Sequence, residues 1–239
     1  MTKRTEELVT AICGAAEHPL APFLRAWCGE SRAFLDFAGA HAGKIRKKAR
    51  LAPQEGERYD LLAELAVAAF LLRDRRFAAV YEPYRGTGQR GPDFLVTFRT
   101  HTPFHVEVTR LRLPDVPRDG GTGLARRLAR MLGDKIGQFP AGGANLLAVF
   151  LPPGVERGAL VPAAVRLLDQ AAQGETDPRA PDPRPEAARA YQRGRHRLSS
   201  VLLCSLAPDG PPGERSLWLN PQTKHPLDGE IARYFVQTA

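Results

Sequence analysis

Two acidic residues stand within a short segment that otherwise reads as β-strand. The segment Gly91–Arg112 has the sequence GPDFLVTFRTHTPFHVEVTRLR, with Asp93 near its start and Glu107 near its end. Mg²⁺ prefers carboxylate and water oxygens and usually takes one or two carboxylates from a protein. It also stabilises the charge that develops when a phosphodiester is hydrolysed. Asp93 and Glu107 therefore form a candidate site for Mg²⁺, or for Mn²⁺ in its place.

The hydrophobic pattern predicts a hairpin around this pair. The first half of the segment, PDFLVTF, is rich in strand-forming residues, and Pro92 fits only where a strand begins. In the second half apolar and polar residues alternate, which places Glu107 and Thr109 together on a polar face. Residues 99–103 have the short length that hairpin connections prefer. We expect Asp93 at the mouth of this hairpin.

A third acidic residue lies in the helix predicted before the hairpin. The pattern from Arg58 to Asp74 is that of a largely buried helix, and Glu64 interrupts its apolar surface. A buried carboxylate is costly unless it meets a cation, a metal or a hydrogen-bond partner. Glu64 is thus a candidate for a polar site. The alternative places it with Asp60 on a narrow exposed stripe.

The segment after the hairpin supplies a candidate cation. Residues 124–139 predict a basic helix in which Lys135 and Gln138, three residues apart, share a face. Residues 145–151 have the length and apolar content of a buried central strand, so the default is a parallel strand–helix–strand unit. Lys135 would orient a water or offset developing negative charge, and Gln138 would hold the nucleophile or a phosphate oxygen.

The order of these elements resembles the core of the PD-(D/E)XK nuclease superfamily over roughly residues 58–151. Pro92 and Asp93 match the PD of that motif, and Glu107 matches its second acidic residue. Glu64 matches the acidic residue that the family often carries on its first core helix. The resemblance implies an α/β fold, a restriction-endonuclease-like sandwich whose mixed central β-sheet is flanked by helices. It also implies that the paired carboxylates hold Mg²⁺ at the edge of the sheet.

The motif departs from the family at one position. Thr109 stands where the family's lysine normally lies, and threonine supplies no positive charge. Lys135 and Gln138 resemble polar residues that several branches place on the next helix, and we infer that Lys135 substitutes for the missing lysine. The alternative is a site that has lost its hydrolytic power. His105 shares the polar face with Glu107, either as a hydrogen-bond partner and proton carrier or as a half-exposed strand residue.

The composition favours a nucleic-acid partner. The chain has 239 residues and a formal net charge of +8, and much of the excess is arginine, which suits phosphate oxygens. Candidate phosphate-binding residues come from a basic run, a glycine-rich loop and the helix after the hairpin: Lys44, Arg46, Lys47, Lys48, Arg85, Arg90, Arg126, Arg127 and Arg130. The alternative is that these groups are only solvated and that the charge reflects composition. Because no helix-turn-helix or zinc-finger motif is visible, the sequence sets no preference among nucleic acids.

The rest of the chain is predicted to complete one decorated domain. Residues 1–52 predict a cap of two or three amphipathic helices, and residues 53–239 predict the nuclease-like domain. The C-terminal part is predicted to hold a helix over 160–173, a loop over 174–185, strands over 198–206 and 216–219, and a helix over 228–235. Three cysteines without CxxC spacing indicate reduced thiols in a cytoplasmic protein, and no apolar run is long enough to cross a membrane.

These features predict a metal-dependent nuclease that hydrolyses phosphodiester bonds in DNA through Asp93 and Glu107. One alternative is a catalytically inactive nucleic-acid-binding protein on the same fold. A third interpretation is a protein-interaction module whose basic charge is compositional. Acyl transfer has no support, because the sequence has no GxSxG motif and no cysteine with a neighbouring histidine. Nucleases that cut both strands commonly pair their sites, so a homodimer is the assembly to consider.

Overall fold

The computed structural model describes residues 2–15, 17–52, 54–84, 91–112, 121–175, 183–205 and 213–237, leaving aside the side chains of residues 121 and 122. Within these ranges the helices are α1 (Lys3–Cys13), α2 (Ala21–Glu30), α3 (Arg32–Ala40), α4 (Ala42–Leu51), α5 (Glu55–Leu72), α6 (Gly121–Lys135), η1 (Ile136–Gln138), α7 (Leu160–Ala172), α8 (Pro185–Gly194), η2 (Arg195–Arg197) and α9 (Gly229–Val236). The strands are β1 (Phe77–Tyr81), β2 (Phe94–Phe98), β3 (Thr102–Arg110), β4 (Ala144–Leu151), β5 (Ser200–Ser205) and β6 (Arg215–Leu219).

One mixed sheet organises the molecule. Its described strands lie in the order β1-β2-β3-β4-β5-β6. The neighbours β1–β2, β2–β3 and β5–β6 are antiparallel, whereas β3–β4 and β4–β5 are parallel. The predicted hairpin is therefore β2–β3, and the predicted parallel unit is β3–α6–β4. This confirms an α/β fold with a mixed sheet flanked by helices.

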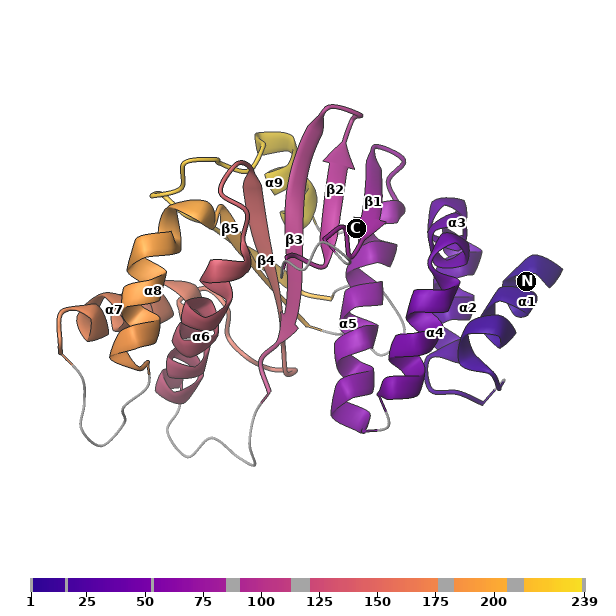
Figure 1. The fold of residues 1–239 in the computed structure, drawn as a ribbon, viewed down its shortest axis with the longest axis horizontal. Helices are drawn as coiled ribbons and strands as arrows, with labels where there is room; N and C mark the ends of the chain where they lie inside the picture. Colours follow the sequence, from indigo (N-terminus) through magenta and orange to yellow (C-terminus); the bar gives the residue numbers. More distant parts are fainter. Residues whose placement is uncertain are drawn as a thin grey trace.

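Each face of the sheet has its own hydrophobic core. Along β4, Leu146 and Ala148 belong to the first core, and Leu147 and Val149 belong to the second, as the two-residue period of a strand requires. Helix α5, the N-terminal helices and α9 cover the first core, whereas α6, α7 and α8 cover the second (Figure 1). Because β4 is buried on both faces, it reads in the sequence as a continuous apolar run.

The N-terminal region forms four helices where two or three were predicted. Helices α2 and α3 are separated only by Ser31, whose hydroxyl accepts the Phe34 amide and caps α3. Trp27 on α2 is fully buried and lies 5.7 Å from the Phe34 ring, edge to face. Phe37 on α3 in turn lies 6.0 Å from the Tyr81 ring of β1. The cap thus packs into the first core of the sheet.

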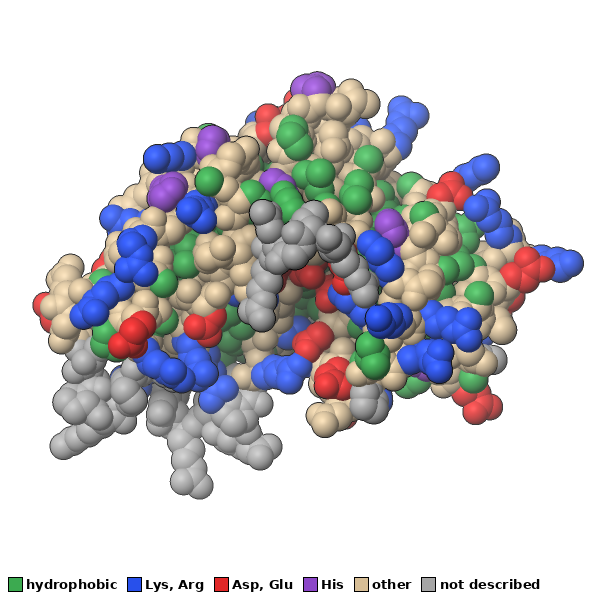
Figure 2. Space-filling model, in the orientation of Figure 1, with side chains coloured by type: hydrophobic (Ala, Val, Ile, Leu, Met, Phe, Trp, Pro, Cys, Tyr) green, Lys and Arg blue, Asp and Glu red, His purple; other side chains and the backbone are tan. Residues whose placement is uncertain are grey.

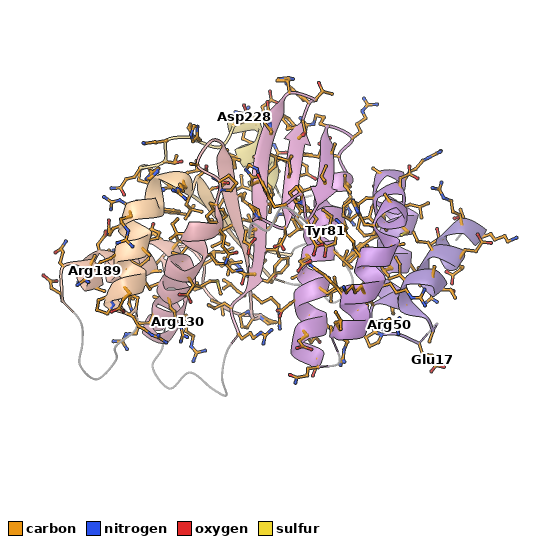
Figure 3. All side chains as sticks on the ribbon, in the orientation of Figure 1. Glu17, Arg50, Tyr81, Arg130, Arg189 and Asp228 are labelled. Carbon is orange, nitrogen blue, oxygen red and sulfur yellow. The ribbon has the colours of Figure 1, made fainter. Side chains whose placement is uncertain are left out.

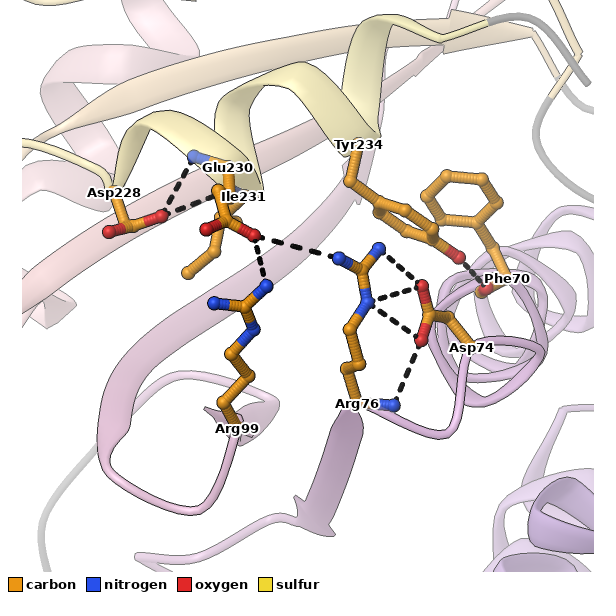
Figure 4. Close-up of polar contacts among 8 residues, drawn as sticks. All are labelled: Phe70, Asp74, Arg76, Arg99, Asp228, Glu230, Ile231 and Tyr234. Carbon is orange, nitrogen blue, oxygen red and sulfur yellow. Dashed lines mark hydrogen bonds and ion pairs between the residues drawn. The ribbon is translucent and has the colours of Figure 1, made fainter.

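Helix α9 closes the first core at the C-terminal end of the chain. The β2–β3 turn puts Arg99 in the left-handed backbone region, and its guanidinium lies 2.7 Å from Glu230 of α9. Tyr234 donates its hydroxyl to the carbonyl oxygen of Phe70 on α5, at 2.7 Å (Figure 4). The Asp228 carboxylate caps the helix by accepting the amides of Glu230 and Ile231. These contacts fix α9 against α5 and the hairpin turn.

Several boundaries differ from the predicted ones. The helix predicted over residues 124–139 begins at Gly121 and ends at Lys135. The residues predicted to form its last turn form the short helix η1 instead. Helix α8 was not predicted, although its Pro185 at the first position is a start signal. Most of the loop predicted over 174–185 lies outside the described residues. None of the helices in the described ranges has the length and apolar character needed to cross a bilayer.

Candidate functional site

The candidate site lies where β2 and β3 separate. The last residue pair of the hairpin joins Phe94 to Val106, and β3 continues beyond it as far as Arg110. The backbone amide of Val108 therefore has no β2 carbonyl to meet, and it donates instead to Oδ2 of Asp93 at 2.8 Å. The Asp93 carboxylate is thus held between the ends of the two strands.

A small pocket opens at this point between α5, β3 and α6. Its volume is about 260 Å³. The lining residues come from α5, the start of β2, the end of β3 and the end of α6: Asp60, Ala63, Glu64, Asp93, Glu107, Val108, Thr109, Arg110, Arg112 and Lys135. Five of the six predicted catalytic residues are among them. The fold therefore brings together residues from four separate segments of the chain.

Two carboxylates in the pocket, Asp93 and Glu107, have raised pKa values. Burial raises the pKa of Asp93 well above its usual range, and the charges of Glu64 and Glu107 raise it further. Burial likewise raises the pKa of Glu107, and Lys135 only partly offsets this effect. In the described part of the chain Asp93 has no ion-pair partner. The pocket therefore concentrates more negative charge than its own cations neutralise.

Lys135 is the cation that meets Glu107. Its Nζ lies 2.5 Å from Oε1 of Glu107, whose side chain is only 5% exposed. Lys135 is the last residue of α6, where the helix dipole favours a positive charge. Thr109, at the motif's lysine position, also lines the pocket. Lys135 therefore points toward Glu107, on the side of the pocket that Thr109 also lines.

Glu64 has a different setting from the other two carboxylates. Its Oε2 atom accepts a hydrogen bond from Nζ of Lys48 at 2.7 Å and another from the hydroxyl of Tyr81. Lys48 also lies 3.0 Å from Glu82 and 4.8 Å from the centre of the Tyr81 ring. Burial alone would lower the pKa of Lys48, but Glu64 and Glu82 outweigh it and raise that pKa. Lys48 therefore stays charged at the side of the pocket.

Sequence analysis grouped Lys48 with the phosphate-binding residues of α4, and the structure divides that group. Lys44 and Lys48 face inward: Lys44 donates to the Tyr81 carbonyl at 3.1 Å, and Lys48 meets Glu64. The exposed residues Arg46, Lys47 and Arg50 line a surface groove instead. The signal was present in the sequence, because Lys44 and Lys48 are four residues apart and flank the buried stripe of α4.

Two further predicted residues lie outside the pocket. Gln138 belongs to η1 and is not among the described residues that line it. His105 does not line the pocket either, and its Nε2 lies 2.8 Å from the Tyr84 hydroxyl. Burial lowers the pKa of His105. Among the described residues, neither Gln138 nor His105 contacts the carboxylates of the pocket.

Basic side chains lie on both sides of the pocket. Figure 2 shows lysines and arginines gathered over α6 and over α4. Arg130 of α6 and Arg50 of α4 lie on the same lower side of the molecule, with β3 and α5 between them (Figure 3). Arg126, Arg127 and Arg130 all belong to α6, and the guanidinium of Arg127 donates to the carbonyl oxygen of Arg112. Arg85 and Arg90 lie outside the described residues.

The pocket's rim holds two arginines that sequence analysis missed. Arg110 binds Asp60 at 2.8 Å and stacks its guanidinium over the Tyr59 ring. Arg112 binds the second oxygen of the same carboxylate, and its side chain is 59% exposed. The Asp60 carboxylate thus forms ion pairs with both arginines. Arg110 is the last residue of β3 and Arg112 follows two positions later, and both reach Asp60 on α5.

The donor set of the pocket suits Mg²⁺ or Mn²⁺. Among the described residues, no group of three or more histidines, cysteines, aspartates and glutamates comes together as a metal cage. Mg²⁺ needs no such cage, because it keeps several waters and takes one or two carboxylates. Asp93, which has no ion-pair partner among the described residues, and the adjacent Glu107 supply that number.

Comparison with known proteins adds no relative: no family model matches the chain, and no curated protein or solved structure is significantly similar to it. The resemblance to PD-(D/E)XK nucleases therefore rests on the motif and on the order of the elements.

Proposed function

We propose that this protein is a metal-dependent nuclease of the PD-(D/E)XK type, with a restriction-endonuclease-like fold, that hydrolyses phosphodiester bonds in DNA. The observation that carries the proposal is the shared pocket of Asp93, Glu107 and Lys135. Two of these residues come from strand ends and one from a helix end. Packing alone does not require such a concentration of buried charge, because buried ion pairs contribute little net stability.

Each residue has a distinct role in this proposal. Asp93 and Glu107 would hold Mg²⁺, which neutralises charge on the phosphate and lowers the pKa of water. Lys135 holds Glu107 in place through its 2.5 Å contact and offsets negative charge that develops on the phosphate. The amide of Val108 fixes Oδ2 of Asp93. Thr109 leaves room beside Glu107 without adding charge.

The basic surfaces favour a polyanionic substrate. The exposed residues of α4 and the arginines of α6 flank the pocket, so that a phosphate backbone would cross it. A catalytically inactive nucleic-acid-binding protein with the same surfaces is the second candidate. Thr109 is the observation that favours it, because the family's usual lysine is missing there.

Cleavage assays separate the two candidates. Purified protein is incubated with supercoiled plasmid, single-stranded DNA or RNA, with Mg²⁺, Mn²⁺ or a chelator. We expect cleavage that needs the divalent cation and falls at least 100-fold in Asp93→Asn and Glu107→Gln. Asp36→Asn, which removes a charge from an exposed pair with Arg4 at 2.8 Å, is the matched control.

The outcomes assign the function directly. Salt-sensitive DNA binding without cleavage would support the inactive protein. Cleavage that survives both Asp93→Asn and Glu107→Gln would show that the chemistry occurs elsewhere.

A further inference from the structure

A cation from the N-terminal cap reaches the pocket. Lys48 on α4 is 29% exposed in its side chain, and it contacts Glu64 on α5 at 2.7 Å. Tyr81 at the end of β1 binds the same carboxylate with its hydroxyl. Figure 3 labels Tyr81 where β1 passes beside α5. Three elements therefore converge on one side chain of the pocket wall.

Both contacts go to the same oxygen of Glu64. Lys48 and Tyr81 each donate to Oε2, and Oε1 accepts no hydrogen bond from any residue within the described ranges. Each carboxylate oxygen has two acceptor sites, so Oε2 can take both donors while the sites of Oε1 stay available to a ligand. Here one oxygen is fixed twice, and Glu64 lines the pocket that also holds Asp93 and Glu107.

We infer that Lys48 and Tyr81 are positioning residues that hold Glu64 by Oε2, so that Oε1 serves the hydration shell of a divalent cation held by Asp93 and Glu107. The inference rests on the proposed function, and it adds residues of the cap and of β1 to the metal site. It also removes Lys48 from the surface that binds nucleic acid. Outer partners of this kind fix the orientation of the groups that serve a metal.

Charge and positioning predict opposite effects for Lys48. Removing a positive charge beside a cation site strengthens cation binding by simple electrostatics. Removing a hydrogen-bond donor that orients Glu64 weakens it. Tyr81→Phe removes a donor without changing any charge, so it tests positioning alone. Lys48→Arg keeps both the charge and the donors.

The experiment measures Mn²⁺ affinity of the full chain by calorimetry, with folding checked by circular dichroism. We expect Tyr81→Phe, Lys48→Met and Glu64→Gln each to weaken Mn²⁺ binding about tenfold, and Lys48→Arg to remain within a few-fold of the original protein. The controls are Lys3→Met on α1, where the side chain is 92% exposed, and Tyr234→Phe, which loses a hydroxyl bond to Phe70, a residue that does not line the pocket.

Each result has a defined meaning. Unchanged affinity in Tyr81→Phe, or tighter binding in Lys48→Met, would overturn the inference while loss of binding in Asp93→Asn left the proposed metal site in place. If the original protein binds no Mn²⁺, the proposed function and the inference both fail. Should Lys48→Met fail to fold, Tyr81→Phe and Lys48→Arg still decide the question.

Discussion

At the scale of single residues, ionising the buried Asp93 carboxylate costs folding free energy in the metal-free protein. The carboxylate is buried beside Glu64 and Glu107, and these effects raise its pKa. In the unfolded chain the pKa returns to its ordinary value of about 4. The metal-free protein therefore holds protons more tightly when folded, and its stability falls as the pH rises through the raised pKa.

Asp93→Asn is accordingly expected to stabilise the metal-free protein. Asparagine can still accept the Val108 amide, but it carries no charge. At pH 7 the free energy of unfolding should rise by about 1 kcal/mol, which is the usual size of a single stabilising substitution. Below about pH 4 the difference should vanish. Urea unfolding in chelator at both pH values measures it, and a less stable variant at pH 7 would contradict the charge argument.

Substitutions at Lys135 and Thr109 test whether Lys135 replaces the lysine that the family usually has at position 109. Lys135→Met should reduce the cleavage rate at least 100-fold, because it removes a charged group from the reacting centre. Thr109→Lys, which restores the family's usual position on β3, should recover at least tenfold in the Lys135→Met background. Initial rates at saturating Mg²⁺ give both numbers. Recovery by Thr109→Ser as well would show that charge is not the cause.

Residue type and pattern singled out Asp93 and Glu107, because carboxylates that interrupt strand patterns stand out in a sequence. Lys135 followed from the helix face that it shares with Gln138 and from the family resemblance. Tyr81 and Arg112 could not be found in this way. Tyr81 looks like an ordinary strand aromatic, and its bond to Glu64 depends on where β1 meets α5. Arg112 lies beyond the paired residues of the hairpin. It reaches the pocket because β3 continues past the end of its pairing with β2.

At the scale of elements, α4 presents two basic faces with different partners. Lys44 and Lys48 turn toward acidic groups, whereas Arg46, Lys47 and Arg50 are exposed. A count of charges along the sequence does not distinguish these two faces. The packing of Ile45 and Ala49 into the first core sets the rotation of the helix and so separates them.

The exposed face of α4 is expected to carry salt-dependent DNA binding. Replacing Arg46, Lys47 and Arg50 together by glutamine should lower the slope of log affinity against log salt by about 2 to 3, since each phosphate contact contributes about 0.9. Surface changes of this kind usually alter stability by only about 0.5 kcal/mol each. Fluorescence anisotropy at several salt concentrations measures the slope.

The control has the same loss of charge on other helices. Lys3, Arg4 and Arg32 are well exposed on α1 and α3, and their replacement by glutamine should leave the slope nearly unchanged. An equal fall in both variants would mean that the basic charge acts only through composition.

The elements themselves were largely predictable where they are long or periodic. Helix α5, strand β4, helix α7 and the hairpin follow from their hydrophobic patterns. The full division of the cap was not predictable, because Ser31 alone separates α2 from α3 and His41 alone separates α3 from α4, and neither is a proline or a glycine. The parallel pairing of β3 with β4 followed from the intervening helix, whereas the placing of β5 and β6 depended on contacts between distant segments.

At the scale of the whole molecule, the cap and the sheet share one core. Phe37 of α3 lies 6.3 Å from the Phe94 ring of β2, and Trp27 and Ile45 belong to the same cluster as α5. The predicted division near residue 52 falls between α4 and α5. A chain cut there would expose the apolar face of α5 to water, at a cost of about 25 cal/mol for each Å².

The fragment 53–239 is therefore expected not to fold on its own. Calorimetry of the full chain should show one cooperative transition that includes the cap, and the fragment should lack near-ultraviolet circular dichroism. A soluble, cooperatively folded fragment would show instead that residues 53–239 form an independent domain.

The chain's two tryptophans lie in different surroundings. Trp27 is buried within the first core, and Trp218 is half-buried on β6 against the second. A buried indole emits at shorter wavelength and is quenched poorly by acrylamide. A partly exposed indole emits at longer wavelength and is quenched more readily. The molecule therefore carries two natural optical reporters, one for each face of its sheet. Replacing either indole by phenylalanine leaves a protein whose emission follows a single core through unfolding.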